Sequence, residues 1–243
     1  IYQTTFVDGQ WAVPAVAPFS TDRDETPFIT PDGNTFYFGS QREIPGKPNL
    51  GGFDMNVWTM QREETGWSDP EPLPAPINYV QEKGENWPSS NNNFFFTPDG
   101  KTHYYATMYR GDKAIQVYKT EQTEAGFTEP ERIEGFFEND SLWKYSVSIS
   151  PDGQYLVFNT YQAPGGQGGE DLYVSQKTAS GWSKAVSMGS TINTAGEEGS
   201  GRFSPDGRYF FYTHADNLGN DEYGPWSIYY LETEYLNLAR LFE

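Results

Sequence analysis

The stretch that decides the fold is "FSPDGRYFFYTH" at residues 203–214, because the chain contains the same pattern three more times. The other copies read "ITPDGNTFYFGS" at 29–40, "FTPDGKTHYYAT" at 96–107 and "ISPDGQYLVFNT" at 149–160. Asp-Gly is a strong turn signal, because Gly accepts a positive φ and Asp can bond its own backbone. Alternating aromatic and polar residues follow each corner, which is typical of a strand. Each copy therefore predicts an antiparallel hairpin.

A second hairpin is predicted between these copies, where two aromatic residues lie nine positions apart on either side of a polar turn. The pairs are Tyr2 and Trp11, Trp58 and Trp67, Tyr118 and Phe127, and Tyr173 and Trp182. Two hairpins make a four-stranded unit, and four-stranded repeats of about 40 to 50 residues are typical of β-propeller blades. Because Trp11, Trp67 and Trp182 recur at one repeat position, we interpret them as structural.

The sequence predicts one all-β domain, a β-propeller of four-stranded antiparallel blades over residues 1–243. Five third strands but only four first hairpins can be counted. This favours five blades, with the first blade incomplete and its first hairpin upstream of this chain. The alternative is four blades closed by the N-terminal segment. The first corners are 67 residues apart, against 53 and 54 for the others, which indicates an insertion within "NWPSSNNNFFFTPDG". The repeats are placed at approximately 1–19 (partial), 20–78, 79–135, 136–193 and 194–243.

The composition limits the partners. There are 34 acidic and 16 basic residues, a formal charge of −18, which argues against binding to nucleic acid or to an anionic membrane surface. The chain has no cysteine, so disulfides and thiolate metal sites are excluded. No apolar run is long enough for a spanning helix, and no signal-peptide pattern is present. A cationic partner or calcium is compatible with the charge.

The corners "TPDG" and "SPDG", together with "GGFDMNVW", "GGEDLYVS", "GWSDP", "GWSKA" and "INTAGEEG", resemble the TolB-type propeller repeats of bacterial cell-envelope proteins. The resemblance covers nearly the whole chain. It implies a periplasmic, outer-membrane-associated or extracellular protein that acts as a binding or assembly module for a protein or glycan partner. Some other propellers are lyases that hold a metal with several histidines. Only His103 and His214 occur here, so we expect no such site.

The loops that precede the first strands, here called the channel loops, are the predicted functional region. They read "STDRDETP" (20–27), "VQEKGENWP" (80–88), "FENDSLWKYS" (137–146) and "TAGEEGSG" (194–201). First strands line the axis of a propeller, so we expect the side chains of these loops to converge, with Arg23, Lys83, Lys144 and Arg202 interleaved among the acids. The candidate ligand-binding residues are Asp24, Glu25, Glu82, Glu85, Trp87, Trp143, Tyr145, Glu197 and Glu198.

Several interpretations of this acidic set stay open. Carboxylates that converge suit calcium, although no metal ligand can be assigned. A pair of carboxylates at a suitable separation can act as acid and base on a glycosidic bond. Aromatic side chains beside them can stack on sugar rings, although propeller aromatics more often pack between blades. The charges can also be ordinary solvated loop charges.

Two Gly-rich loops, "PGKPNLGGFD" (45–54) and "APGGQGGED" (163–171), connect second and third strands. We expect Asp54 and Asp171 at their ends to bond the loop backbone rather than a metal. The chain has no G-x-S-x-G motif, phosphate-binding loop or histidine cluster. The sequence therefore favours a non-catalytic binding module, with no catalytic residue assigned. A carbohydrate-active lyase or hydrolase that uses axial carboxylates is the alternative.

Overall fold

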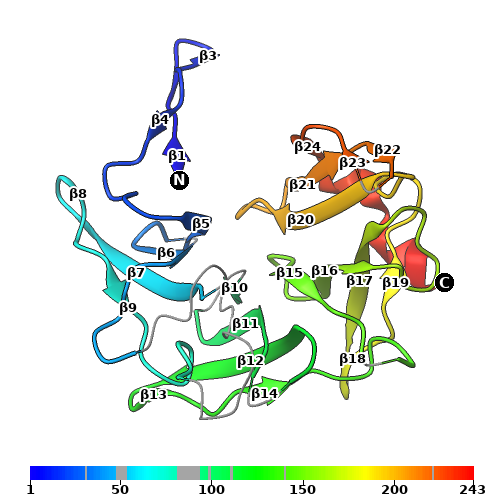
Figure 1. The fold of residues 1–243 in the computed structure, drawn as a ribbon, viewed down its shortest axis with the longest axis horizontal. Coiled ribbons are helices and arrows are strands. Elements are labelled where there is room, and N and C mark those ends of the chain that lie inside the picture. The colour runs from blue at the N-terminus through cyan, green and yellow to red at the C-terminus, as the bar shows by residue number, and fades with distance from the viewer. Residues whose placement is uncertain are drawn as a thin grey trace.

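The fold is a β-propeller with four blades around one axis. Figure 1 shows the sheets arranged in a ring, with the first strand of each blade nearest the centre. The predicted fold class is thus found in the structure, with the alternative count of four blades. The N-terminal segment does not close the ring as that alternative expected, because among the described residues its strands pair only with one another. The computed structural model describes residues 1–30, 32–47, 54–80, 94–97, 100–109, 112–139, 141–220 and 222–243. The predicted insertion before the second corner lies largely outside these residues.

Blades 1 to 3 are antiparallel meanders whose fourth strand is split into two short pieces that both pair with the third, whereas blade 4 has three strands. Blade 1 contains β5 (Asp24–Ile29), β6 (Thr35–Ser40), β7 (Asn56–Glu63), β8 (Gly66–Trp67) and β9 (Glu71–Pro72). Blade 2 contains β10 (Phe94–Phe96), β11 (Thr102–Thr107), β12 (Gln116–Thr123), β13 (Gly126–Phe127) and β14 (Glu131–Arg132). Blade 3 contains β15 (Tyr145–Ile149), β16 (Tyr155–Tyr161), β17 (Glu170–Thr178), β18 (Gly181–Trp182) and β19 (Val186–Ser187). Blade 4 contains β20 (Glu197–Phe203), β21 (Tyr209–Ala215) and β24 (Ser227–Glu232).

The repeated corner is held by side-chain hydrogen bonds that explain its sequence. In blade 4 the hydroxyl of Ser204 donates to Asp206 Oδ1 at 2.6 Å, and the amide of Arg208 donates to the same oxygen at 3.0 Å. The amide of Tyr209 donates to the Ser204 hydroxyl at 2.9 Å. Gly207 has a φ of 72°, which favours glycine. Ser or Thr, Asp and Gly are therefore each required at the corner, and the predicted hairpins are confirmed.

The first strands of blades 1, 3 and 4 share a bulge one to three residues after the strand begins. Thr26, Ser146 and Ser200 have φ values of 50°, 48° and 52°, and the strand register shifts at each of them. A bulge bends a strand and re-aims the side chains that follow it. The same irregularity in three of the inner strands shows that it belongs to the fold and shapes the axis.

The core lies between neighbouring blades. One cluster joins blades 2 and 3 around Phe136, Val147 and Phe158, all fully buried. Similar clusters join blades 1 and 2 and blades 3 and 4. Each fully buried side chain of this size contributes about 1.5–3 kcal/mol by removing apolar surface from water. The aromatic-rich composition is thus used for stacking between sheets.

The two ends of the chain differ in how they pack. The N-terminal arm contains β1 (Tyr2–Gln3), β2 (Phe6–Val7), β3 (Gln10–Trp11) and β4 (Ala15–Val16), and it projects away from the ring (Figure 1). The C-terminal end forms two 3₁₀ helices, η1 (Thr233–Leu236) and η2 (Leu238–Phe242), whose Leu236 and Leu238 are buried against blades 3 and 4. A hairpin of β22 (Asn217–Gly219) and β23 (Glu222–Tyr223) precedes β24. No described helix has the length and apolar character needed to cross a membrane.

Candidate functional site

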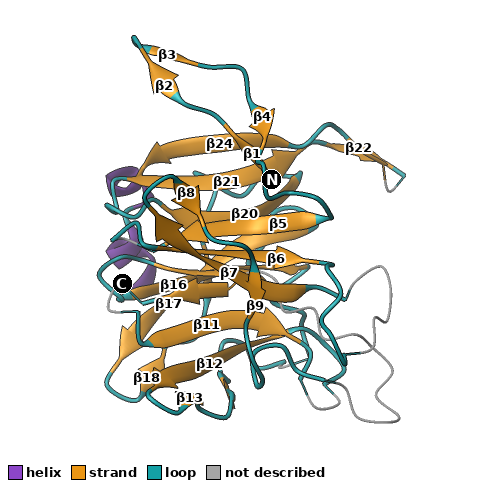
Figure 2. Cartoon of the chain, turned by 90° about the vertical axis from the view of Figure 1, so that its left-hand side faces the viewer, coloured by secondary structure: helices purple, strands orange, loops and turns teal. Residues whose placement is uncertain are grey.

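The ring has two faces, which differ in what they expose. The channel loops and the links between second and third strands form one face, here called the loop face. The Pro-Asp-Gly corners form the other, the corner face. Figure 2 shows the two 3₁₀ helices on one side of the blades and the β22 hairpin on the opposite side, which is the loop face. The predicted site residues belong to the loop face.

In blade 1 the predicted acids are held by arginines of the same blade. Asp24 has a fully buried side chain, and its Oδ1 lies 3.0 Å from Nη1 of Arg42. Arg42 follows β6 and also donates to Asp24 Oδ2 at 3.1 Å. Glu25 pairs with Arg23. Among the described residues no hydrogen bond or ion pair connects Asp24 or Glu25 to the acids of blades 3 and 4.

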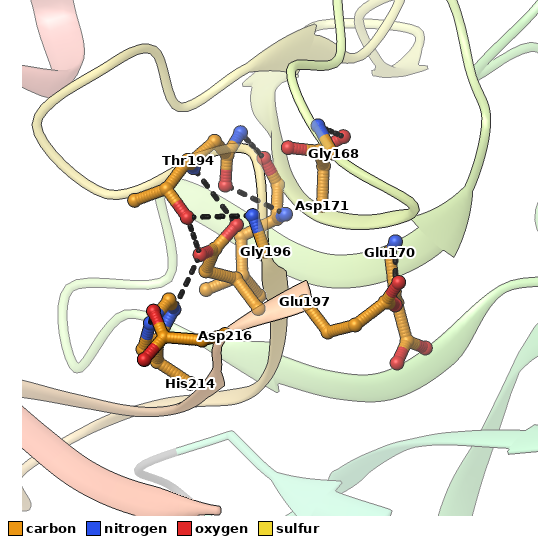
Figure 3. Close-up of polar contacts among 11 residues, drawn as sticks. Gly168, Glu170, Asp171, Thr194, Gly196, Glu197, His214 and Asp216 are labelled. Atoms are coloured by element: carbon orange, nitrogen blue, oxygen red, sulfur yellow. Dashed lines mark hydrogen bonds and ion pairs between the residues drawn. The ribbon is translucent and has the colours of Figure 1, made fainter. Parts of the chain in front are cut away.

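In blade 4 the side chain of Glu198 is fully buried and holds its own loop. Figure 3 shows its partner Thr194 on that loop, with His214 and Asp216 nearby. Its Oε2 accepts from the Thr194 amide at 2.9 Å, and its Oε1 accepts from the Thr194 hydroxyl at 2.6 Å. His214 on β21 places Nδ1 at 2.7 Å from Glu198 Oε1 and Nε2 at 3.2 Å from Asp216 Oδ1. Burial lowers the pKa of His214, but the bonds to these two carboxylates outweigh it and raise the pKa above 6.5. Glu198 thus ties β20, β21 and the channel loop together.

The Gly-rich loop of blade 3 packs directly on this channel loop. Asp171 Oδ2 accepts from the amides of Gln167 at 3.0 Å and Gly168 at 3.2 Å, which confirms the prediction that Asp171 binds the loop backbone. A Cβ on Gly168 would overlap the carbonyl of Gly196, and one on Gly169 would overlap the carboxylate of Glu197. The glycines are therefore required for close contact between the two loops.

Glu170, at the start of β17, has the most perturbed carboxyl group of this region. Burial raises its pKa from 4.5 to about 7, and the nearby charge of Glu197 acts in the same direction, against a hydrogen bond from Asn159. The Glu170 amide also donates to Glu197 Oε2 at 2.7 Å. Burial, with a smaller effect of Glu170, raises the pKa of Tyr145 to about 12. We call Tyr145, Asn159, Glu170 and Glu197 the Glu170 cluster.

An aromatic pair extends the Glu170 cluster through Tyr145. The rings of Trp143 and Tyr145 are stacked, with centroids 6.0 Å apart, and both side chains are half-buried. Between them in sequence, Lys144 turns inward and is fully buried, with Nζ at 2.6 Å from Gln116 Oε1. The remaining predicted site residues, Glu82, Glu85 and Trp87, lie outside the described residues.

The described residues contain no group of three or more His, Cys, Asp and Glu side chains arranged to hold a metal ion. His103 is fully buried between the rings of Phe96 and Phe127, and burial lowers its pKa to about 3. It is therefore neutral and serves packing. Calcium binding stays a hypothesis.

The structure brings Glu197 and Glu198 together with residues that the sequence analysis did not select. Glu170 and Asn159 are the main additions, and they come from the second and third strands of blade 3 rather than from a channel loop. The "GGED" segment ends one of the predicted Gly-rich loops, and its glycine run before an acid is the signal that the sequence offers. The site is thus a junction between blades 3 and 4.

No protein-family model matches the sequence, and a search of the curated proteins finds no match. Solved structures do match. TolB from Acinetobacter baumannii superposes with a TM-score of 0.51 at 15% identity, over 88% of this chain and 42% of that one. The chain thus spans less than half the length of this TolB. The likeness shows the fold alone.

Two glycosidases superpose equally well. The α-L-arabinofuranosidase from Lactobacillus brevis has a TM-score of 0.51 at 12% identity, over 95% of this chain and 71% of that one. A thermostable family-43 glycoside hydrolase has a TM-score of 0.51 at 16% identity, over 85% of this chain and 69% of that one. TolB-type propellers and propeller enzymes are therefore both structural neighbours, and function has to be argued from the site.

Proposed function

We propose that the chain is a non-catalytic recognition module of the bacterial cell envelope or secreted fraction, and that it binds its partner on the loop face. One observation supports this most strongly: the buried acids of this face are engaged within the protein. Asp24 is held by Arg42, and Glu198 is held by Thr194 and His214. Carboxylates bound in this way brace the loops, and a rigid face of this kind suits recognition of a partner.

The partner class that fits the face best is a glycan. The stacked Trp143 and Tyr145 offer an aromatic surface for a sugar ring. Beside them, Glu170 with a pKa of about 7 is partly protonated at neutral pH and can both donate to and accept from hydroxyl groups. A protein partner is the other outcome that the experiment below distinguishes.

The test is retention of ligands on the immobilised protein. A mixed pool of envelope and algal oligosaccharides is applied with and without calcium, and the masses of retained and unretained species are recorded. We expect retention of unchanged glycans, at least tenfold weaker for Trp143→Ala and unaffected in Trp11→Ala, a matched change of a tryptophan on the exposed arm. If glycans are retained only in the presence of calcium, this would support a calcium ion bound between the protein and the glycan. If no glycan is retained, the glycan assignment is wrong and a peptide library is the next probe.

The second candidate is a glycoside-cleaving enzyme, and one observation favours it. Glu170 and Glu197 are neighbouring carboxylates, and the pKa of Glu170 is raised to about 7, as a general acid requires. In that case new product masses appear in the same experiment and Glu170→Gln abolishes them. The kcat/KM of the wild type would then fall as the pH rises above about 7, because the acid form of Glu170 is lost.

A further inference from the structure

A separate cavity lies on the axis toward the corner face, away from the loop-face acids. Its volume is about 340 Å³, within the range of small-molecule sites, and all four blades contribute to its wall. The lining includes Phe28 of blade 1, Phe95 and Phe96 of blade 2, Pro151 of blade 3, and Arg202 and Phe203 of blade 4. This cavity plays no part in the proposed recognition of a partner on the loop face.

The wall of the cavity is aromatic and well packed. The ring of Phe28 lies 4.9 Å from that of Phe95 and stacks on that of Phe96 at 5.8 Å, measured between centroids. These contacts join the neighbouring blades 1 and 2. An apolar wall of this kind favours an apolar ligand body, because its contact with the rings removes both from water.

Arg202 is the exception in this wall, and the fold does not require it. The same repeat position, two residues before the Ser or Thr of the corner, holds Phe28, Phe95 and Ser148 in the other blades. Strand pairing is equivalent at all four, as in the pairs Arg202 with Phe211 and Phe28 with Tyr37. An aromatic or small residue therefore suffices for the structure, and the guanidinium is specific to blade 4.

The charge of Arg202 is not neutralised within the described residues. Its Nη1 is buried and has no hydrogen-bond partner there, and no carboxylate forms an ion pair with it. Burial lowers its pKa to about 10, so the side chain is cationic at neutral pH. An unpaired buried charge is costly, and arginines that serve structure are normally paired. The guanidinium is available to an anion that enters the cavity.

We propose that the axial cavity binds a small carboxylic acid with an aromatic or aliphatic body. The carboxylate pairs with Arg202, and the body lies against the phenylalanine rings. Guanidinium and carboxylate match in geometry, since two parallel N–H···O bonds can form. A single arginine, with no second cation among the lining residues that the structure describes, suits one negative charge better than the two charges of a phosphate monoester.

The experiment compares acids with neutral analogues of the same shape on the whole protein. Phenylacetate, 4-phenylbutanoate and octanoate, and the amide of each, are titrated by calorimetry and by the shift in melting temperature. We expect at least one acid to bind at least tenfold more tightly than its amide. Arg202→Met removes this preference and leaves amide binding unchanged, whereas Arg202→Lys keeps part of it. Arg208→Met is the control, because Arg208 lies on the same hairpin over the ring of Tyr209 and is absent from the cavity lining.

Three results would overturn the proposal. They are equal affinity for acid and amide, equal losses in the Arg202→Met and Arg208→Met variants, and the absence of binding by all three acids. Melting curves of each variant show whether it is folded, and Arg202→Lys keeps the test valid if the methionine variant does not fold. Loop-face recognition is unaffected by any of these outcomes, because its residues lie at the other end of the axis.

Discussion

At the scale of single residues, an asparagine side chain forms the hydrogen bonds that a neighbouring strand would make with the third strand of the blade. Asn193 accepts from the Leu172 amide at 2.9 Å and donates to the Leu172 carbonyl at 2.9 Å, so it pairs with β17 as a backbone would. Asn78 does the same at Val57 in blade 1. We expect Asn193→Ala to lower the free energy of unfolding by about 2 kcal/mol, because the buried Leu172 amide loses its partner, whereas the Leu172 carbonyl still accepts from the Met188 amide at 3.0 Å.

Urea denaturation measures this loss. Asn217→Ala, on the exposed β22 hairpin, is the matched control and should change the free energy of unfolding by less than about 0.5 kcal/mol. Equal effects of the two changes would mean that the hydrogen bonds of the Asn193 side chain do not stabilise the blade.

A second residue-scale prediction concerns Arg202. Because its Nη1 is buried without a partner, replacing it with methionine removes an unpaired charge from an aromatic wall. We expect Arg202→Met to raise the free energy of unfolding of the ligand-free protein by about 1–2 kcal/mol. Urea denaturation without any added acid provides the measurement. A loss of stability instead would show that the guanidinium serves the fold.

The same scale shows what a sequence can and cannot tell about a site. The structure of the corner can be predicted from the sequence, because Ser204, Asp206 and Gly207 bond one another within a few positions of the chain. The proximity of Glu170 to Glu197 cannot be predicted from the sequence. The two residues are 27 positions apart, and their contact depends on how blades 3 and 4 pack against each other. Arg202 was grouped with the loop charges, but the bulge at Ser200 separates it from them and it lines the cavity toward the corner face.

At the scale of elements, the N-terminal arm repeats the outer half of blade 1. Tyr2 pairs with Val16 and Phe6 with Trp11, just as Trp58 pairs with Pro72 and Arg62 with Trp67, all at a constant offset along the chain. The second hairpin was therefore predictable from aromatic spacing alone. Its packing was not, since Tyr2 is 71% exposed whereas Trp58 is 7% exposed.

This difference predicts unequal costs for one substitution at equivalent positions. Trp11 is 69% exposed and contacts the ring of Phe6, whereas Trp67 packs against Phe36 in the core of blade 1. We expect Trp11→Ala to change the free energy of unfolding by less than about 0.5 kcal/mol and Trp67→Ala to lower it by about 2 kcal/mol. Chemical denaturation of both variants measures these changes in the free energy of unfolding. A large cost at Trp11 would mean that the arm packs on the ring in solution.

At the scale of the whole molecule, the strand count explains why blade number was harder to predict than fold class. The four corners fixed the repeat, but the fifth third strand belongs to the arm, which has no inner hairpin among the described residues. Blade 4 ends at β24, whose outer edge is unpaired in the described chain and exposes Ile228 and Tyr230. Local patterns define a blade, while ring closure depends on contacts between distant parts of the chain.

The last prediction is the pH dependence of global stability. The folded-state pKa of Glu170, about 7, lies above its ordinary 4.5, so the folded protein binds more protons than the unfolded chain between these values. Stability from this group is therefore complete below pH 4.5 and is lost as the pH rises toward 7, by on the order of 3 kcal/mol. His214 acts in the same direction, because its raised pKa gives stability that is lost as the pH rises through the folded value.

Both groups thus make the protein less stable at pH 8 than at pH 5, and the growing negative charge adds repulsion. Urea denaturation at pH 5, 6, 7 and 8 measures the slope. Glu170→Gln should flatten it between pH 5 and 7, and His214→Gln should flatten it above pH 6.5, whereas Glu124→Gln at an exposed turn should leave it unchanged. A wild-type stability that rises from pH 5 to pH 7 would contradict the assignment of Glu170 as a buried carboxyl group with a raised pKa, because its deprotonation is expected to lower the stability in this range.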